Sequence, residues 1–278
     1  MNISLDINTI KPVSQTIPVV SSELGWKDYL GTIRVRWGIG RDHYTIAPGL
    51  YKVGNPTADS DVFVSANYKL SFDTLRKNLG GLNAWILVID TKGINVWCAA
   101  GKGTFGTENI IKSIKNCTLD QIVTDRRIIV PQLGAPGVAA HTVKEQSGFK
   151  VVYGPVRAKD IKSFIGNKYK AGTEMRRIDF PMKERAKLIP VDFMYGKYKL
   201  LGMLAALFIL SGLDSSGLSF SRMLSSSLFP LINIAGAYIA GIVIAPILLP
   251  VAPFRAFALK GAFWGLLFTV LINLVFPV

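Results

Sequence analysis

The chain has 278 residues and a formal net charge of +14, a length that allows one soluble domain with its own core plus a smaller appendage. Its two cysteines, Cys98 and Cys117, lie 19 residues apart and its two histidines are His43 and His141, so its own thiolates cannot build a zinc or iron–sulfur site. Of the 32 Lys and Arg residues, 27 precede Phe193, and so do 17 of the 18 acidic residues. The last 86 residues therefore carry few charges and differ in composition from the rest of the chain.

The chain begins with weakly patterned residues and then alternates apolar runs with helical patterns. Residues 1 to about 30 are interpreted as an extended arm, and Ile33, Val35, Trp37 and Ile39 alternate with Arg and Gly, which predicts a strand at Thr32–Ile39. Further strands are predicted at Asp61–Ser65, Trp85–Ile89, Arg127–Val130 and Phe149–Tyr153, and helices at Phe72–Leu79, Glu108–Lys115, Val138–Gln146 and Val156–Phe164. This alternation indicates an α/β domain with a mostly parallel, Rossmann-like sheet.

The apolar C-terminal third predicts about three membrane spans. Met223–Phe254 and Gly261–Val278 contain no charged residue. Leu200–Leu213 is short for a span, but Phe193–Tyr198 extend it if Lys197 and Lys199 reach the membrane surface. We therefore divide the chain into an N-terminal arm with a first strand at 1–50, the α/β domain at 51–190 and a transmembrane α-helical domain at 191–278.

The distribution of charge predicts how the chain sits in a membrane. The N-terminus does not resemble a secretory signal peptide, and Lys and Arg are enriched on the flank that precedes the first span, so the α/β domain is expected on the cytoplasmic side of a multi-pass inner-membrane protein. The basic segment Lys159–Lys187 is either a solvated face or a surface that rests on anionic membrane lipid. Since the membrane accounts for the positive charge, no nucleic-acid partner is expected.

The segment Thr91–Thr107 carries the chemistry. If Asn95 is the N-cap of a helix, its side chain accepts a hydrogen bond from the backbone of Cys98, the third helical residue. The start of a helix favours a thiolate over a thiol, and Lys102, four residues further on, adds positive charge on the same face.

Three alternatives for this segment stay open on spacing alone. Cys98 is either a small buried apolar residue, which is the common role of a lone cysteine, or a metal ligand. A catalytic nucleophile needs a base, and neither histidine stands in a recognisable triad motif. Gly101–Gly106 reads GKGTFG and matches the GxGxxG pattern of a nucleotide-binding oxidoreductase, but it starts twelve residues after the predicted strand, whereas the first glycine of a dinucleotide fingerprint follows its strand at once.

Three segments resemble the family of mercury-methylating corrinoid proteins (HgcA): Ala66–Asp73, Trp85–Asp90 and, above all, Asn95–Lys102, which is followed by GTFGT. That family is itself similar to the large subunit of the corrinoid iron–sulfur protein. The resemblance implies a cobalamin or related corrinoid whose cobalt takes Cys98 as its lower axial ligand and catalytic residue. It also implies a cap helix under the corrin ring, with cofactor-binding residues Asn95, Val96, Trp97, Cys98, Ala99, Ala100, Gly101, Lys102, Gly103 and Thr104.

The same resemblance implies the activity and the partners. The expected function is that of a corrinoid-dependent methyltransferase, which passes a methyl group from cobalt to Hg(II) and gives methylmercury. The implied partners are a ferredoxin-like 4Fe–4S electron donor and a methyl donor system such as a methyltetrahydrofolate methyltransferase. The alternative functions are a corrinoid methyl carrier of one-carbon and acetyl-CoA metabolism, and a nucleotide-binding membrane oxidoreductase that uses GKGTFG.

Overall fold

The computed structural model describes residues 17–275, and these residues form two compact units. The α/β unit contains the described residues up to Tyr29 together with Asp42–Arg177. The helical unit contains Leu30–Arg41 and the described residues from Ile178 onward. Residues 1–16 of the predicted arm and 276–278 of the predicted last span lie outside the described residues.

The α/β unit is built on a five-stranded, mostly parallel sheet. Its strand order is β1-β3-β2-β4-β5; β1 is antiparallel to β3, and the other neighbours are parallel. The strands are β1 Gly49–Val53, β2 Val62–Ala66, β3 Ala84–Ile89, β4 Arg127–Val130 and β5 Lys150–Tyr153. β2 and β3 are buried at every position, because helices cover both faces of the sheet and leave no face for water.

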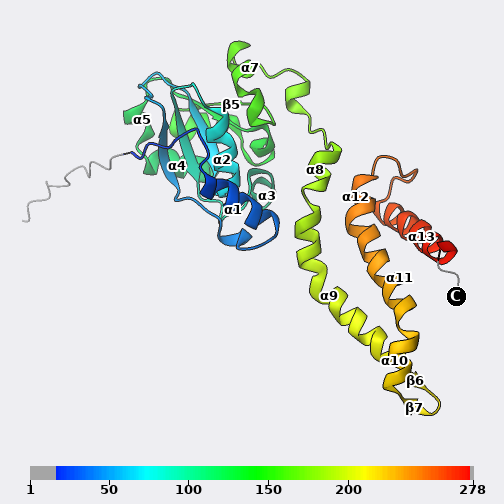
Figure 1. Ribbon diagram of the computed structural model, residues 1–278. Helices are drawn as coiled ribbons and strands as arrows, with labels where there is room; N and C mark the ends of the chain where they lie inside the picture. Colours follow the sequence, from blue (N-terminus) through cyan, green and yellow to red (C-terminus); the bar gives the residue numbers. More distant parts are fainter. Residues whose placement is uncertain (1–16, 276–278) are drawn as a thin grey trace, which may run out of the picture. The chain divides into compact units, whose positions relative to one another are not determined.

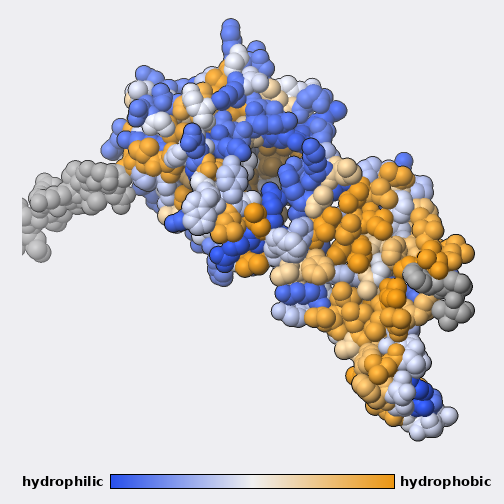
Figure 2. Space-filling model, viewed as in Figure 1, coloured by the Kyte–Doolittle hydropathy of each residue, from blue (hydrophilic) through white to orange (hydrophobic). Residues whose placement is uncertain are grey.

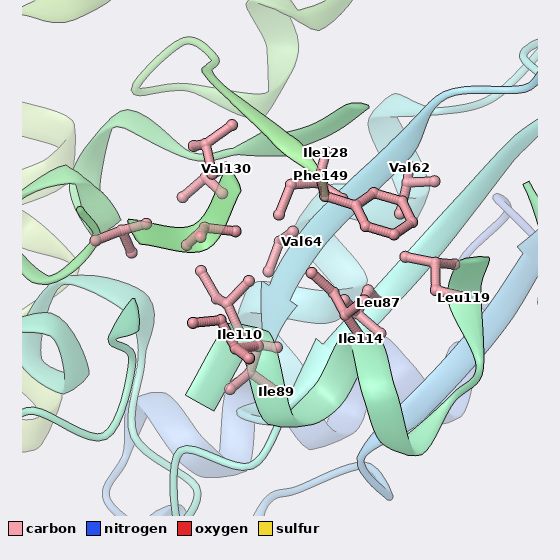
Figure 3. Close-up of a cluster of buried hydrophobic side chains, with 14 of the residues drawn as sticks. Val62, Val64, Leu87, Ile89, Ile110, Ile114, Leu119, Ile128, Val130 and Phe149 are labelled. Carbon is pink, nitrogen blue, oxygen red and sulfur yellow. The ribbon is translucent and has the colours of Figure 1, made fainter. Parts of the chain in front are cut away.

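Helices flank the sheet on both sides (Figure 1). On one face, Ile110 and Ile114 of α4 and Leu119 of α5 join a core with Val64 and Leu87 of the strands (Figure 3). On the other face, α2 and α7 join a second core with the alternate strand residues. The helical segments of this unit are α2 Lys69–Asn78, α3 Val96–Gly101, α4 Thr107–Asn116, α5 Leu119–Ile122, α6 Ala140–Ser147 and α7 Ile161–Gly166, with short 3-10 turns η1 Arg41–His43, η2 Gln132–Gly137, η3 Ala158–Asp160 and η4 Glu174–Arg176.

The predicted α/β class with a mostly parallel sheet is confirmed, and so are the four strands and the helices predicted from residue 61 to residue 164. The strand predicted at Thr32–Ile39 is wrong: this segment belongs to helix α1, Trp26–Arg36, and to the turn that follows it. The helix buries Val35 and leaves Ile33 and Trp37 exposed, an arrangement that alternation cannot describe. Strand β1 was not predicted.

An ion-pair cluster ties the start of α1 to α2. Asp28 lies 2.5 Å from the Nζ atom of Lys69 and 2.8 Å from Nη2 of Arg76, and both cations also pair with Asp73. Asp73 and Arg76 are buried, at 2% and 7% exposed, whereas their partners Asp28 and Lys69 are half-buried. Burial raises the pKa of Asp28, but hydrogen bonds from Lys69 and Arg76 outweigh it and bring the pKa down to about 2. This group of four residues is called the Asp28 cluster below.

The helical unit contains three helices that are long and apolar enough to cross a membrane, by length and composition: Met182–Leu210, Leu228–Ile247 and Phe257–Val275. Apolar side chains dominate the visible surface of this unit (Figure 2). Its elements are α8 Met182–Ala186, α9 Ile189–Leu210, the short hairpin β6 Leu213–Asp214 and β7 Gly217–Leu218, α10 Phe220–Ser226, α11 Leu228–Ile239, the π-helical turn η5 Ala240–Ile244, α12 Ala245–Ile247 and α13 Phe257–Val275. The predicted number of three spans agrees with these helices.

Candidate corrinoid site

The short helix α3 follows β3 through a turn and presents Cys98 on its exposed side. Asn95 is the N-cap: its backbone is extended, and its side-chain Oδ1 accepts a hydrogen bond of 2.9 Å from the backbone N–H of Cys98. The cap fixes the first turn because it satisfies an N–H group that has no partner inside the helix. The predicted cap and the predicted helical position of Cys98 are therefore both confirmed.

The turn before α3 is anchored by Asn67, which directly follows β2 and is 6% exposed. Its Oδ1 accepts hydrogen bonds from the backbone N–H groups of Thr91 and Gly93, each 3.0 Å long, and lies 2.8 Å from the Thr91 hydroxyl. Its amide nitrogen donates to Asp90 at 3.3 Å. One buried side chain thus ties the carboxyl end of β2 to the loop that leads into α3.

The same turn requires unusual backbone at two positions. Gly93 has a φ of +73°, and a Cβ there would lie 2.9 Å from Thr45 Cγ2 and 3.0 Å from the carbonyl oxygen of Asp42. Lys92 also has a positive φ, +58°. Hydrogen bonds from the Lys92 side chain and backbone hold the pKa of Asp90 below its usual value. The approach to α3 is therefore a tightly specified turn and not a free loop.

Helix α3 has one exposed and one buried side. Trp97 is 64% exposed, and Cys98, Gly101 and Lys102 are exposed with it. A Cβ added to Gly101 would meet no atom within 4 Å, so the space beside this part of the exposed side is open. Val96, Ala99 and Ala100 are buried on the opposite side. Seven of the ten predicted cofactor-binding residues are thereby divided between a surface face and an anchoring face, the other three being the N-cap Asn95 and, after the helix, Gly103 and Thr104.

The buried side of α3 packs closely against η2. A Cβ on Gly134 would lie 2.5 Å from the ring of Phe105, and one on Gly137 would overlap the carbonyl oxygen of Phe105 and lie 3.3 Å from the backbone of Ala100. Ala99 is fully buried in the core. The glycines of η2 and the buried alanines of α3 thus allow these two segments to approach each other closely.

The GKGTFG segment connects α3 to α4. Gly103 adopts a φ of +76°, and the backbone N–H groups of Thr104 and Phe105 donate to the carbonyl of Ala99 at 2.9 and 3.1 Å. Phe105 is fully buried, and Gly106 is the N-cap of α4. A phosphate-binding loop needs free N–H groups that point outward. Since two of these groups are used inside the loop, the nucleotide interpretation gains no support.

A cavity of about 410 Å³ lies beside α3 at the carboxyl ends of the parallel strands. The chain passes from β2 to β3, which neighbours β2 on one side, and then to β4, which neighbours β2 on the other side. Ligands of open α/β sheets bind at such switch points of the strand order. The lining is mostly apolar and comes from β2, α2, α3, β4 and the segment after β5. Asn95, Val96 and Trp97 contribute to this lining, whereas Cys98 does not.

The arrangement of possible metal ligands limits what Cys98 can hold. The described residues contain no group of three or more His, Cys, Asp or Glu side chains that is placed to bind a metal ion. Cys117 ends α4, is half-buried against the core, and burial raises its pKa. A bare metal ion needs several protein donors. Among the described residues, Cys98 therefore does not belong to a donor set that could hold a bare metal ion.

The residues missed by the sequence analysis are those that position α3 from a distance. Asn67, Gly134 and Gly137 all lie in segments that follow a parallel strand. Because the carboxyl ends of parallel strands meet at one edge of the sheet, polar and glycine residues directly after two such strands were a usable signal. Thr45, which a Cβ on Gly93 would approach, had no comparable signal.

Comparison with known proteins finds a family match for a part of the chain that lies mostly in the α/β unit. Residues 32–165 match the family described as CO dehydrogenase/acetyl-CoA synthase delta subunit. The chain is 30% identical over 139 residues to the acetyl-CoA decarbonylase/synthase complex subunit gamma of Archaeoglobus fulgidus, which covers 48% of the chain and 29% of that protein. It is also 30% identical over 117 residues to the corrinoid/iron–sulfur protein large subunit of Moorella thermoacetica, which covers 41% of the chain and 26% of that protein.

These matches make the chain a relative of corrinoid proteins over its α/β unit. A third relative, the acetyl-CoA decarbonylase/synthase complex subunit gamma 2 of Methanosarcina mazei, is 32% identical over 111 residues, which are 38% of the chain and 23% of that protein. The chain thus spans less than a third of the length of these relatives. Two of the three are named as subunits of acetyl-CoA decarbonylase/synthase complexes and one as a corrinoid protein.

Proposed function

We propose that the α/β unit binds a corrinoid against the exposed side of α3, with Cys98 as the lower axial ligand of its cobalt, and that the protein is a methyltransferase with Hg(II) as the methyl acceptor. The observation that carries the proposal is a single exposed thiol at the start of a capped helix, beside a cavity at the switch point of the sheet. The relatives named as corrinoid/iron–sulfur and acetyl-CoA synthase subunits support the choice of cofactor.

The donor set fits such a cofactor. A corrin ring would supply most of the ligands of its cobalt, so the protein would need to add only one donor. Cys98 would be that donor, and among the described residues it belongs to no group of three or more His, Cys, Asp or Glu side chains that could hold a bare ion. The open space beside Gly101 leaves room for a large planar group on the exposed side of α3. The cavity, with its mostly apolar lining, is of the size of an ordinary small-ligand pocket and suits the smaller appendages of the cofactor.

The residues around Cys98 would each help to hold helix α3 or the cofactor. Asn95 holds the first turn of α3 and leaves the Cys98 sulfur free, while Asn67 fixes the turn that precedes it. Trp97 is exposed and also lines the cavity, so it offers an apolar surface beside the sulfur. Lys102, four residues after Cys98, places a positive charge on the same exposed side of the helix. Val96, Ala99 and Ala100 anchor the helix from its buried side.

When bound, the corrinoid would supply the cobalt that takes up and gives up the methyl group. A thiolate is a soft, electron-rich donor, and a soft donor below the cobalt favours delivery of the methyl group to a soft, electrophilic acceptor. Hg(II) is such an acceptor, and the resemblance of Asn95–Lys102 to the mercury-methylating corrinoid proteins points to it.

A second candidate function is that of a corrinoid methyl carrier in acetyl-CoA chemistry. It is favoured by the names of the relatives, two of which are subunits of acetyl-CoA decarbonylase/synthase complexes. Against it stand the exposed Cys98 in the eight-residue segment Asn95–Lys102 and the three apolar helices. The two functions differ in the methyl acceptor and are separated by supplying Hg(II) or a nickel-containing partner protein.

The helical unit and the partners complete the proposal. The three apolar helices would insert in the inner membrane and hold the α/β unit at its cytoplasmic surface. Since Cys98 and Cys117 are the only thiols of the chain, electrons for the cobalt must come from a separate protein with its own iron–sulfur clusters, such as a ferredoxin-like donor. A methyltetrahydrofolate-dependent methyltransferase is the expected class of methyl donor.

The ligand role of Cys98 is tested with the full chain, purified without oxygen and loaded with cobalamin. The visible and electron paramagnetic resonance spectra of the unaltered protein are compared with those of Cys98→Ala and Cys117→Ala. We expect the axial-ligand signature to change in Cys98→Ala alone, because Cys117 is half-buried at the end of α4. Identical spectra for all three proteins, or water or imidazole at the lower position, would remove the proposal.

The acceptor is tested separately in a single-turnover assay. Methyl-loaded protein is mixed with Hg(II) or with a nickel partner, and the methylated product is measured by mass spectrometry. Methylmercury formation that is lost in Cys98→Ala and kept in Cys117→Ala is the expected result. Transfer to the nickel partner with none to Hg(II) would favour the carrier function, even where the spectra support Cys98 as the ligand.

A further inference from the structure

Helix α1 exposes a row of large apolar side chains. Trp26, Leu30, Ile33 and Trp37 follow the spacing of one helical face, with Trp37 just beyond the helix end, and are 69%, 47%, 55% and 43% exposed. Val35, on the opposite side, is 2% exposed. The helix therefore packs against the protein with one side and leaves an apolar stripe on the other.

Basic residues border this stripe on both flanks. By helical spacing, Lys27 and Arg34 lie along one edge of the stripe and Arg36 along the other. The acidic residue of the helix, Asp28, lies on the packed side, where it belongs to the Asp28 cluster. The exposed side of α1 is consequently apolar at its centre and positively charged at its edges, the pattern of helices that lie at a membrane surface.

The second half of α1 belongs to the helical unit. Residues 30–41 are part of the same compact unit as the three apolar helices. A Cβ on Gly38 would lie 3.6 Å from Val191 Cγ2 and 3.9 Å from Met194 Cβ, so the chain directly after α1 contacts the beginning of α9. The stripe is thus attached to the N-terminal end of the first apolar helix and not to its middle.

That end of α9 carries the residues typical of a membrane–water interface. Tyr195 and Tyr198 are 63% and 74% exposed, and Lys197 and Lys199 stand beside them before the uninterrupted apolar run begins. Tyrosine and tryptophan concentrate where hydrocarbon meets headgroups, and lysines extend from there into water. Because Val191 and Met194 lie within about two turns of these residues, the end of α1 contacts the same N-terminal part of α9.

We infer that α1 is an interfacial membrane anchor whose apolar stripe enters the headgroup–acyl boundary of an anionic bilayer, with its basic edges on lipid phosphates. The inference rests on the proposed membrane insertion of the three apolar helices. The continuity with α9 and the positive charge on both edges select lipid as the occupant, since a protein partner would explain neither the tyrosines of α9 nor their level. The anchor adds a lipid contact that comes before most of the α/β unit in the chain to the proposed spans, which come after it.

The test uses spin labels on the full chain in vesicles of phosphatidylcholine and phosphatidylglycerol. Single labels are attached in a Cys98→Ser, Cys117→Ser background at Ile33→Cys on α1, at Leu266→Cys on α13 and at Glu145→Cys on α6. All three native side chains are exposed, so the labels leave the packed sides untouched. Collision rates are measured with oxygen, which concentrates in lipid, and with a water-soluble nickel chelate.

We expect an oxygen-to-nickel collision ratio at the Ile33→Cys label that is several-fold higher than at the Glu145→Cys label and below that at the Leu266→Cys label. A ratio at Ile33→Cys equal to that at Glu145→Cys, with Leu266→Cys still in lipid, would overturn the anchor and leave membrane insertion intact. A Leu266→Cys label in water would instead overturn the proposed spans. Shielding of the Ile33→Cys label from both reagents would show that a protein covers the stripe, and would overturn the lipid assignment.

Discussion

Replacing Asn67 with alanine should loosen the turn that carries α3 without unfolding the sheet. The Asn67 Oδ1 atom accepts hydrogen bonds from the backbone N–H groups of Thr91 and Gly93, and both residues are buried. In Asn67→Ala these two donors lose their acceptor. The Thr91 hydroxyl keeps a partner, since its single hydrogen can turn to the carbonyl oxygen of Ile94, 2.7 Å away.

The expected cost follows from the two orphaned donors. A buried donor left without a partner costs roughly 1–3 kcal/mol, and the cavity created by the substitution allows some water to reach the two groups. The variant should therefore lose about 3 kcal/mol of local stability, a large part of the roughly 5–15 kcal/mol that stabilises an ordinary domain. The loss should be concentrated in residues 90–101, because β2 and β3 keep their full ladder of hydrogen bonds.

Amide hydrogen exchange read by mass spectrometry measures this effect segment by segment. We expect exchange in peptides that cover residues 90–101 to accelerate by about a hundredfold, which corresponds to about 3 kcal/mol, while peptides from β2 and β3 change little. The matched control is Asn78→Ala, because Asn78 is only partly buried and its side chain donates a local, solvent-exposed hydrogen bond to the carbonyl of Thr74. Exchange within a factor of about three of the unaltered protein in peptides 90–101 would show that Asn67 does not hold this turn.

Three further predictions concern the same unit. Asn95→Ala should cost about 1 kcal/mol and speed exchange of the Cys98 amide, whereas Asn95→Ser, which keeps a capping oxygen, should restore most of the protection. Gly137→Ala should lower the free energy of unfolding by about 1–3 kcal/mol because its methyl group would overlap the backbone of Phe105. In Gly101→Ala the methyl group would meet no atom within 4 Å, so the free energy of unfolding should not fall. Hydrogen bonds from the two cations of the Asp28 cluster hold the Asp28 pKa at about 2 despite burial, so its stabilisation is fully present above the unfolded pKa near 3.8 and is lost as the pH falls toward 2. Urea unfolding should show a loss of about 1–2 kcal/mol over this range, after allowance for solvent screening, and Asp28→Asn should remove that part of the pH dependence.

Buried, continuous apolar runs made most of the sheet predictable. Trp85–Ile89 and Arg127–Val130 are short, β-branched and bounded by turn residues, and they form β3 and β4 within a residue of the predicted ends. The Asn95 cap was predictable as well, because capping depends on residues three apart in sequence. In both cases the information is local.

The segments that failed are those whose surroundings decide their structure. Ile33, Val35, Trp37 and Ile39 alternate as a strand would, yet in α1 only Val35 is buried. The prediction assumed that apolar residues face a core, and that assumption is wrong for a helix whose apolar stripe is exposed. Strand β1 was missed for a related reason: it has five residues, starts with Gly49 and lies beside β3 at one end of the strand order, so it has too little pattern of its own.

The positioning of Cys98 shows why the candidate site was only half predictable. The hydrogen bond from Asn95 lies within the helix, but the other supports of α3 come from residues far away in sequence: Asn67 from the end of β2, and Gly134 and Gly137 from η2 after β4. These supports touch α3 from its packed side or from the preceding turn. On the exposed side, a Cβ on Gly101 would meet no atom within 4 Å, so the space there is open. Under the proposed function, a large preassembled ligand would bind in this space without rearrangement of the residues that support α3.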